Sequence, residues 1–166
     1  MLNLYLDVFK CLNRRKVKYV VIGGVAAVVH GVPRTTFDLD LLIEATPVNA
    51  TRLLLALGDA GLMTATLTTA ERLLAHEITI FRDWLQVDIQ TRTPGLRFST
   101  AWKNRRKVRA SGTSIPFASR NDLIRSKRAA GRPIDLEDIR QLNLKMDRSQ
   151  QPTSRKPRGD EQSATE

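Results

Sequence analysis

Residues 21–44 read VIGGVAAVVHGVPRTTFDLDLLIE, and this stretch decides the fold. A short apolar run ends in Gly23 and Gly24, and thirteen residues further on Asp38 and Asp40 flank a single leucine. Because side chains alternate along a strand, the two aspartates share one face and the leucines share the other. Two carboxylates on one face repel each other, so this arrangement favours a cation beside them.

The two parts of the stretch predict complementary halves of one site. A strand that turns at Gly23 and Gly24 into a helix exposes backbone N–H groups, and glycine lets a phosphate approach the backbone closely. Asp38 and Asp40 supply the hard oxygen ligands that Mg²⁺ or Mn²⁺ accepts. Together they indicate a site for a nucleoside triphosphate carried with its metal. The alternative is a tight turn followed by an edge strand with solvated aspartates, although an apolar edge strand is unfavourable.

The rest of the sequence predicts an α+β protein with a small mixed sheet flanked by helices. Helical patterns cover residues 2–15, 25–31, 46–61, 68–75, 119–131 and 133–146, and strand patterns cover residues 18–24, 37–43, 77–81, 84–90 and 114–119. The pair at 77–81 and 84–90 is expected to form an antiparallel hairpin. Thr46 is the expected N-cap of the helix that starts at Pro47.

We expect one domain over residues 1–147, with a helical C-terminal part from about residue 119. Residues 148–166 are almost free of apolar side chains, which predicts a disordered basic and polar tail. The single cysteine, Cys11, excludes an intramolecular disulfide, and the N-terminal residues do not read as a secretory signal. No apolar run approaches the roughly 20 residues that span a bilayer. These features predict a soluble, cytoplasmic protein without a membrane segment.

The chain carries 27 Lys and Arg against 17 Asp and Glu, a formal net charge of +10. Such a balance favours polyanionic partners, above all nucleic acid and nucleotides. Residues 92–109 contain seven of the basic side chains, together with Phe98 and Trp102. Basic residues with aromatics can hold a single strand of nucleic acid. The alternative for this segment is a charged loop beside the active cleft.

The stretch from Gly23 to Ile43 resembles the signature of the nucleotidyltransferase superfamily, whose fold is shared by DNA polymerase β and by small antibiotic and toxin nucleotidyltransferases. The matching positions are Ile22, Gly23, Gly24, Asp38, Leu39, Asp40 and Leu41. The later LIRSKRAAGRPIDLEDI is similar to stand-alone bacterial nucleotidyltransferase-like proteins near the AbiEii toxin group. The resemblance spans roughly residues 17–142. It implies the nucleotidyltransferase fold and the transfer of a nucleoside monophosphate to an acceptor hydroxyl.

The superfamily often adds a third carboxylate from a neighbouring strand, and Asp88 is the acid of the strand at 84–90. It would complete a metal triad or act as base toward the acceptor hydroxyl. The alternative is a polar position on the outer face of a hairpin. Glu44 and Glu77 are weaker candidates for the same role.

The resemblance also implies roles for residues outside these strands. Lys127, in the middle of a predicted helix, would reach the triphosphate and offset charge on the leaving pyrophosphate; otherwise it is a solvated helix lysine. Asp135 belongs to the site or caps the last helix. Arg34 contacts phosphate or serves as a turn arginine, and His30 is expected to have a packing role.

These expectations combine into one function, a metal-dependent nucleotidyltransferase with a nucleoside triphosphate as substrate. The basic charge and the toxin-like resemblance favour RNA, including tRNA, as the acceptor; a protein hydroxyl or a small molecule is the alternative acceptor. They also suggest the toxin of a toxin–antitoxin pair, with an antitoxin protein as partner. The alternative function is a non-catalytic nucleotide- or RNA-binding module of the same fold.

Overall fold

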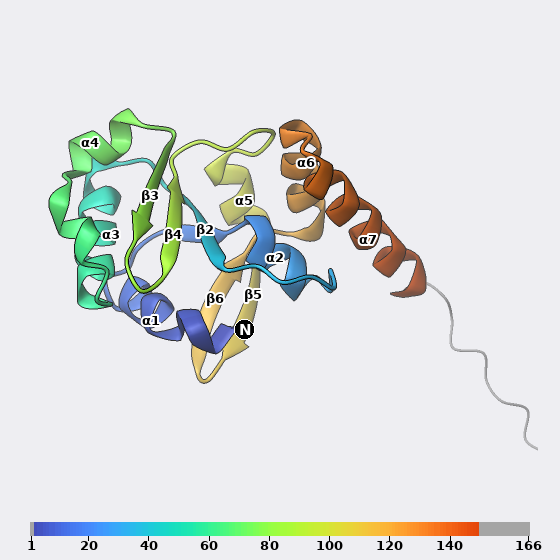
Figure 1. The fold of residues 1–166 in the computed structure, drawn as a ribbon, viewed down its shortest axis with the longest axis horizontal. Helices are drawn as coiled ribbons and strands as arrows, with labels where there is room; N and C mark the ends of the chain where they lie inside the picture. Colours follow the sequence, from blue (N-terminus) through green and yellow to red (C-terminus); the bar gives the residue numbers. More distant parts are fainter. Residues whose placement is uncertain (1, 150–166) are drawn as a thin grey trace, which may run out of the picture.

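The computed structural model describes residues 2–149, and their side chains up to residue 144. Its centre is a mixed sheet in the order β3-β4-β2-β1-β6-β5 (Figure 1). The strands are β1 (Tyr19–Val21), β2 (Asp38–Ile43), β3 (Ile78–Arg82), β4 (Gln86–Gln90), β5 (Arg106–Ala110) and β6 (Thr113–Phe117). Neighbours β2/β4 and β1/β6 are parallel, and β1/β2, β3/β4 and β5/β6 are antiparallel. The α+β class and the 77–90 hairpin predicted from the sequence are therefore confirmed.

Helices lie around this sheet, with α3 and α4 at one end and α6 and α7 at the other (Figure 1). The α-helices are α1 (Leu6–Arg14), α2 (Gly23–Val29), α3 (Pro47–Asp59), α4 (Ala70–Ala75), α5 (Phe98–Asn104), α6 (Arg120–Ala130) and α7 (Pro133–Ser149). Two 3₁₀ turns, η1 (Leu2–Tyr5) and η2 (Met63–Leu67), precede α1 and α4. Residues 150–166, the greater part of the predicted tail, lie outside the described residues.

The sheet buries its two faces unequally. The large core collects the side chains of β1, β2 and β4 that point to one face, such as Tyr19, Leu39 and Val87, together with those of α1 and α3. The opposite face has a smaller cluster around Val20 and Ile22, covered by α5. The aspartates of β2 lie on this second face, because they alternate with the buried leucines. The sheet thus leaves one face partly open for polar side chains.

Local sequence explains several boundaries. Thr46 caps α3 by accepting a hydrogen bond from the backbone N–H of Asn49 at 3.3 Å, and Pro47 occupies the first helical position. Ser119 caps α6 in the same way through the N–H of Asp122. Gly131 ends α6 in the left-handed conformation, φ 67°. The Thr46 cap was predicted from the sequence, and the structure confirms it.

The basic segment at residues 92–109 is a loop only in its first part, residues 92–97. The rest forms the short helix α5 and most of the edge strand β5, neither of which its composition predicted. Basic side chains on an edge strand discourage pairing with another chain, which accounts for the weak apolar pattern of RKVRA. In the described part of the chain, no helix is long and apolar enough to cross a membrane.

Candidate active site

Asp40 and Asp88 face each other across the adjacent strands β2 and β4. β2 and β4 run parallel, and their register pairs Asp38 with Gln86 and Asp40 with Asp88. All four side chains lie on the sheet face opposite the large core, since Val87 and the leucines of β2 fill that core. The structure therefore brings Asp40 and Asp88, which are 48 residues apart in sequence, to paired positions on adjacent strands.

Asp40 occupies a place where a carboxylate ionises reluctantly. Burial raises its pKa to about 6, and the carboxylates of Asp88 and Asp38 add to the rise. The backbone N–H of Gly24 and the ammonium of Lys127 oppose it only in part. A group held this way is stabilised by any cation that can approach, which is the electrostatic signature of a functional position.

Asp88 experiences a milder form of the same environment. Burial is the largest cause that raises its pKa, and Asp38 contributes, whereas a hydrogen bond from Gln86 and the charge of Arg82 hold it down. The amide of Gln86 donates to Asp88 at 3.0 Å, as that of Gln90 does to Asp40 at 3.3 Å. Gln86, two residues before Asp88 on β4, thus orients Asp88. Gln90, on the strand next to β2, orients Asp40. Neither glutamine was predicted as a site residue, because amide side chains carry no motif at these positions.

Asp38 takes a different position. Its side chain is exposed, and it does not line the cavity that Asp40 and Asp88 share. Among residues 2–149, no three His, Cys, Asp or Glu side chains come close enough together to enclose a metal ion. The donor set nevertheless fits Mg²⁺, which prefers one or two carboxylates and fills its other positions with water and phosphate. The crowded, unneutralised pair of Asp40 and Asp88 is what such a cation would relieve.

The two glycines allow close approach of other groups to the turn after β1. Gly23 has φ +63°, and a Cβ there would collide with the Asp40 carboxylate. A Cβ on Gly24 would lie 2.9 Å from the Arg34 guanidinium and 2.5 Å from the hydroxyl of Thr36. The segment between α2 and β2 therefore folds back over the glycine pair. Only glycine fits under these side chains.

Lys127 projects from α6 into a buried network with α7. Its ammonium lies 3.1 Å from Asp135 and 2.6 Å from Asp138, and its side chain is only 4% exposed. Arg34 forms two hydrogen bonds to Asp138, at 2.9 and 3.1 Å. Arg132 pairs with Asp135 at 2.6 Å. Two buried carboxylates thus share three basic groups, as the interior of a protein requires.

The expectation that Asp135 caps the last helix is wrong. α7 begins at Pro133, so Asp135 lies in its first turn with its side chain turned toward α6. Burial alone would raise its pKa, but hydrogen bonds from Arg132 and Lys127 hold the pKa below its ordinary value. Asp138, which was not predicted as a site residue, also binds the ammonium of Lys127. Its spacing of three residues from Asp135 on a helix was the available signal.

A cavity of about 320 Å³ connects these groups. Its walls include residues of all the elements just described, among them Gly23, Asp40, Asp88, Gln90, Lys127, Arg132 and Asp135. Arg132 was not predicted from the sequence; its side chain is 69% exposed, and its pKa is raised mainly by the hydrogen bond to Asp135, with a contribution from the charge of Asp40. The cavity thus offers two carboxylates on one wall and two basic groups on the other. Such a division suits a metal-bound polyphosphate.

The other candidates lie elsewhere. Glu44 pairs with Lys18 at 2.9 Å, and Glu77 lies 3.9 Å from Arg92; neither lines the cavity. His30 is buried, and its Nε2 is 2.8 Å from the carbonyl oxygen of Ala118, which agrees with a packing role.

Solved structures and a family model match this chain. Among solved structures, a candidate nucleotidyltransferase from Thermotoga maritima matches with 18% identity and a TM-score of 0.48, over 89% of this chain and 92% of that one. An antigenic nucleotidyltransferase-like protein from Paracoccidioides brasiliensis matches with the same identity and TM-score, over 81% and 71%. No curated protein matches significantly.

The decisive comparison is with a family model. Residues 5–149 match the model described as nucleotidyltransferase of unknown function, DUF6036. The match runs from the first turn of the chain to the end of α7, and so includes both the glycine–aspartate stretch and the Lys127 network. The chain therefore belongs to this family of nucleotidyltransferases.

Proposed function

We propose that the protein transfers a nucleoside monophosphate from a nucleoside triphosphate to an acceptor hydroxyl in a metal-dependent reaction. The observation that carries the proposal is the in-register pair Asp40 and Asp88, which are crowded, partly buried and raised in pKa beside the Gly23 turn. A structural role would not account for two mutually repelling carboxylates on adjacent strands, each turned toward one cavity.

Asp38, Asp40 and Asp88 would hold Mg²⁺ or Mn²⁺. The cation, when bound, supplies the positive charge that neutralises the triphosphate and polarises its α-phosphoryl group. Gly23 and Gly24 carry no Cβ, so Asp40, Arg34 and Thr36 pack directly against this turn, and we propose that phosphate oxygens bind beside it. These residues thus bind and orient the triphosphate with its α-phosphorus toward the carboxylate pair.

The reaction needs one bond made and one broken. The acceptor oxygen bonds to the α-phosphorus, the bond from that phosphorus to the bridging oxygen breaks, and pyrophosphate leaves with the electron pair. The acceptor proton passes to a carboxylate, and we assign this role to Asp88, which faces the cavity beside Asp40. Its second possible role, as a third metal carboxylate, separates by experiment. In that case Asp88→Asn weakens Mg²⁺ binding, whereas loss of a proton acceptor alone leaves metal affinity unchanged.

The opposite wall of the cavity supplies positive charge for the leaving group. Lys127 and Arg132 line it, and Asp135 holds both in place. Arg34 lies against Gly24 while Asp138 fixes its guanidinium, so it is oriented toward the same turn. We propose that these three basic side chains contact the triphosphate and offset charge that develops on pyrophosphate.

RNA, including tRNA, is the acceptor that we propose, since a chain with net charge +10 attracts polyanions. The setting that the family resemblance suggests is a toxin controlled by an antitoxin protein.

The test uses the full chain with each of the four nucleoside triphosphates, labelled on the α-phosphate, together with Mg²⁺ and total RNA or cell extract. Label should move to an acceptor in a metal-dependent manner and should disappear in Asp38→Ala and Asp40→Ala. Lys10→Ala, at an exposed site on α1, is the matched control and should retain transfer. Tight RNA binding without label on any acceptor, and unaffected by the aspartate substitutions, would instead identify a non-catalytic binding module.

A further inference from the structure

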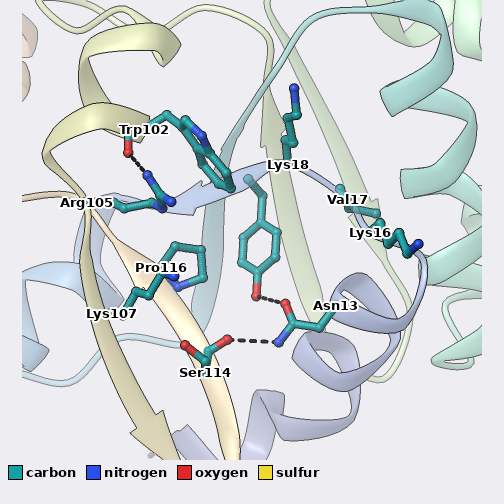
Figure 2. A pocket seen from close by; sticks show the side chains of 10 residues that line it. Asn13, Lys16, Val17, Lys18, Trp102, Arg105, Lys107, Ser114 and Pro116 are labelled. Carbon is teal, nitrogen blue, oxygen red and sulfur yellow. Dashed lines mark hydrogen bonds between the residues drawn. The ribbon is translucent and has the colours of Figure 1, made fainter.

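A second pocket, of about 390 Å³, lies where the turn after α1 and the start of β1 meet α5, β5 and β6. Figure 2 shows Trp102, Arg105 and Lys107 on one side of it and Lys16 and Lys18 on the other. These residues come from segments some ninety positions apart, roughly 16–19 and 102–116. The sequence indicated a basic character only for the second segment, so this pocket could not be predicted from the sequence.

The lining of this pocket is basic. It includes four Lys and Arg side chains and no Asp or Glu. Lys18 pairs with Glu44 at 2.9 Å. For Lys16, Arg105 and Lys107 the described residues provide no carboxylate within ion-pair distance. Uncompensated positive charge at a concave surface attracts a polyanion.

The pocket also offers a flat cationic surface. The guanidinium carbon of Arg105 lies 3.9 Å from the centroid of the Trp102 ring, and Phe98 stacks on Trp102 with centroids 5.7 Å apart. Arg105 donates to the backbone carbonyl of Trp102, while its Nε is buried without an acceptor in the described structure. The indole therefore holds the guanidinium in place, and no acidic side chain does. Nucleobases stack on aromatic rings and on guanidinium planes of this kind.

The position of the pocket relates it to the active site. Lys18, Val20 and Ile22 point to the same face of the sheet, the face that also carries Asp40. The N–H of Ile22 donates to the carbonyl of Asp40, so the active site lies at the far end of the same strand. Ile22 lies four positions after Lys18, which corresponds to roughly 13 Å along an extended chain. α5 covers the interval through Ala101.

We infer that this pocket binds a single-stranded segment of the acceptor RNA, with the lysines on its phosphates and a base against the Arg105–Trp102 pair. The inference rests on the proposed function for its meaning, since it names the acceptor and where the acceptor docks. An acidic protein segment would bind the positive charge, but it has no base that would stack on the Arg105–Trp102 pair. The flat surface therefore favours RNA.

The first experiment measures the affinity of the full chain for a fluorescent single-stranded RNA oligonucleotide by anisotropy over a range of salt. The variant is Lys16→Asn with Lys107→Gln; asparagine suits Lys16 because its φ is +54°. The control, Arg52→Gln with Arg72→Gln, removes the same charge from exposed positions on α3 and α4. Losing two phosphate contacts should reduce the salt slope by about 1.4, which corresponds to about 25-fold weaker binding at 0.1 M salt when extrapolated from 1 M.

The second experiment uses Trp102 as its own reporter. The chain has two tryptophans, and Trp84→Phe leaves Trp102 as the source of emission. RNA should change this emission as it binds, with the same midpoint as the anisotropy. Trp102→Leu should weaken binding by roughly five- to a hundredfold if a base stacks there. The melting temperature of Trp102→Leu shows whether this variant remains folded. If it does not, the variant Lys16→Asn with Lys107→Gln tests the inference by itself.

Several results would overturn the inference. RNA binding that the lysine pair and the control pair reduce equally, or an emission of Trp102 that RNA leaves unchanged, would place the RNA elsewhere. A polyglutamate peptide that displaces the RNA with equal affinity would indicate an acidic protein partner. Binding is measured without nucleotide and also in Asp40→Asn, so it is independent of catalysis. Pocket-dependent binding without any label transfer would refute the proposed function alone. Transfer to RNA that the variant Lys16→Asn with Lys107→Gln leaves unchanged would refute this inference alone.

Discussion

Replacing Asp40 by asparagine should stabilise the protein while it abolishes nucleotidyl transfer. The carboxylate of Asp40 is buried beside Asp88 and Asp38, and its pKa is raised from an ordinary value of 3.8 to about 6. The folded state therefore holds this proton more tightly than the unfolded state does. Above pH 6 the folded protein must keep the group ionised at a cost.

The magnitude follows from that difference. About two pKa units correspond to about 3 kcal/mol, and asparagine, which carries no charge, removes this cost. For a chain of this length 3 kcal/mol is roughly 6–12 °C in melting temperature. The sign depends on pH: the wild type bears no penalty below pH 4, gains it between pH 4 and 6, and bears all of it above pH 6. The advantage of Asp40→Asn should therefore be large at pH 8 and below about 1 kcal/mol at pH 4.

Urea denaturation of the wild type and Asp40→Asn at pH 8 and pH 4, without divalent cations, measures both numbers. Asp38→Asn, at an exposed position on the same strand, is the control and should change stability much less. Added Mg²⁺ should raise the melting temperature of the wild type but not of Asp40→Asn, because a ligand stabilises only a state that binds it. Equal stability of wild type and Asp40→Asn at pH 8, or a gain of the same size at pH 4, would refute the electrostatic reasoning.

Two further substitutions test other parts of the site, and a third tests the burial of His30. Gly23→Ala should cost more than the 1–2 kcal/mol expected from left-handed backbone strain alone, because its Cβ meets a carboxylate, whereas Gly112→Ala, with φ +77° and open space around it, should cost only that strain; urea midpoints compare them. Lys127→Met should destabilise by about 1.5–3 kcal/mol, since it removes one of the cations that pair with the two buried carboxylates while Arg132 and Arg34 remain, and thermal melts should show part of the loss restored when either carboxylate is also made an amide. Burial lowers the pKa of His30 below 6.5, so the wild type should lose stability relative to His30→Gln as pH falls below about 6.5, by at most about 1.4 kcal/mol per pH unit.

The sequence was most informative where one residue type satisfies one local requirement. Leucines that alternate with Asp38 and Asp40 determined which face of the strand is buried, and burial of Leu39 agrees. Gly23 marked a turn that no side chain could occupy. Thr46 marked a helix start through its own backbone hydrogen bond. Each of these conclusions needs only neighbours within a few positions.

Features set by distant segments could not be read in the same way. That Asp88 lies opposite Asp40, and not one residue out of register, depends on how β4 joins β2, and a shift of one residue would turn Asp88 into the core. The pairing of Lys127 with Asp138 depends on how α7 packs on α6. Strand β5 escaped detection because an edge strand can carry arginine at most of its positions.

The network around Lys127 explains why Asp40 remains available for a cation. A lysine that lines the same cavity could form a salt bridge with Asp40 and neutralise it, which would leave a divalent metal little to gain. Asp135 and Asp138 bind the ammonium of Lys127 at 3.1 and 2.6 Å, so its attraction on Asp40 is only a minor opposing influence. Burial and the charges of Asp88 and Asp38 therefore raise the pKa of Asp40 with little opposition from Lys127, and positive charge from outside the chain would relieve this repulsion. The two acids of α7 thus contribute to the site by pairing with the ammonium of Lys127, which would otherwise compete for Asp40.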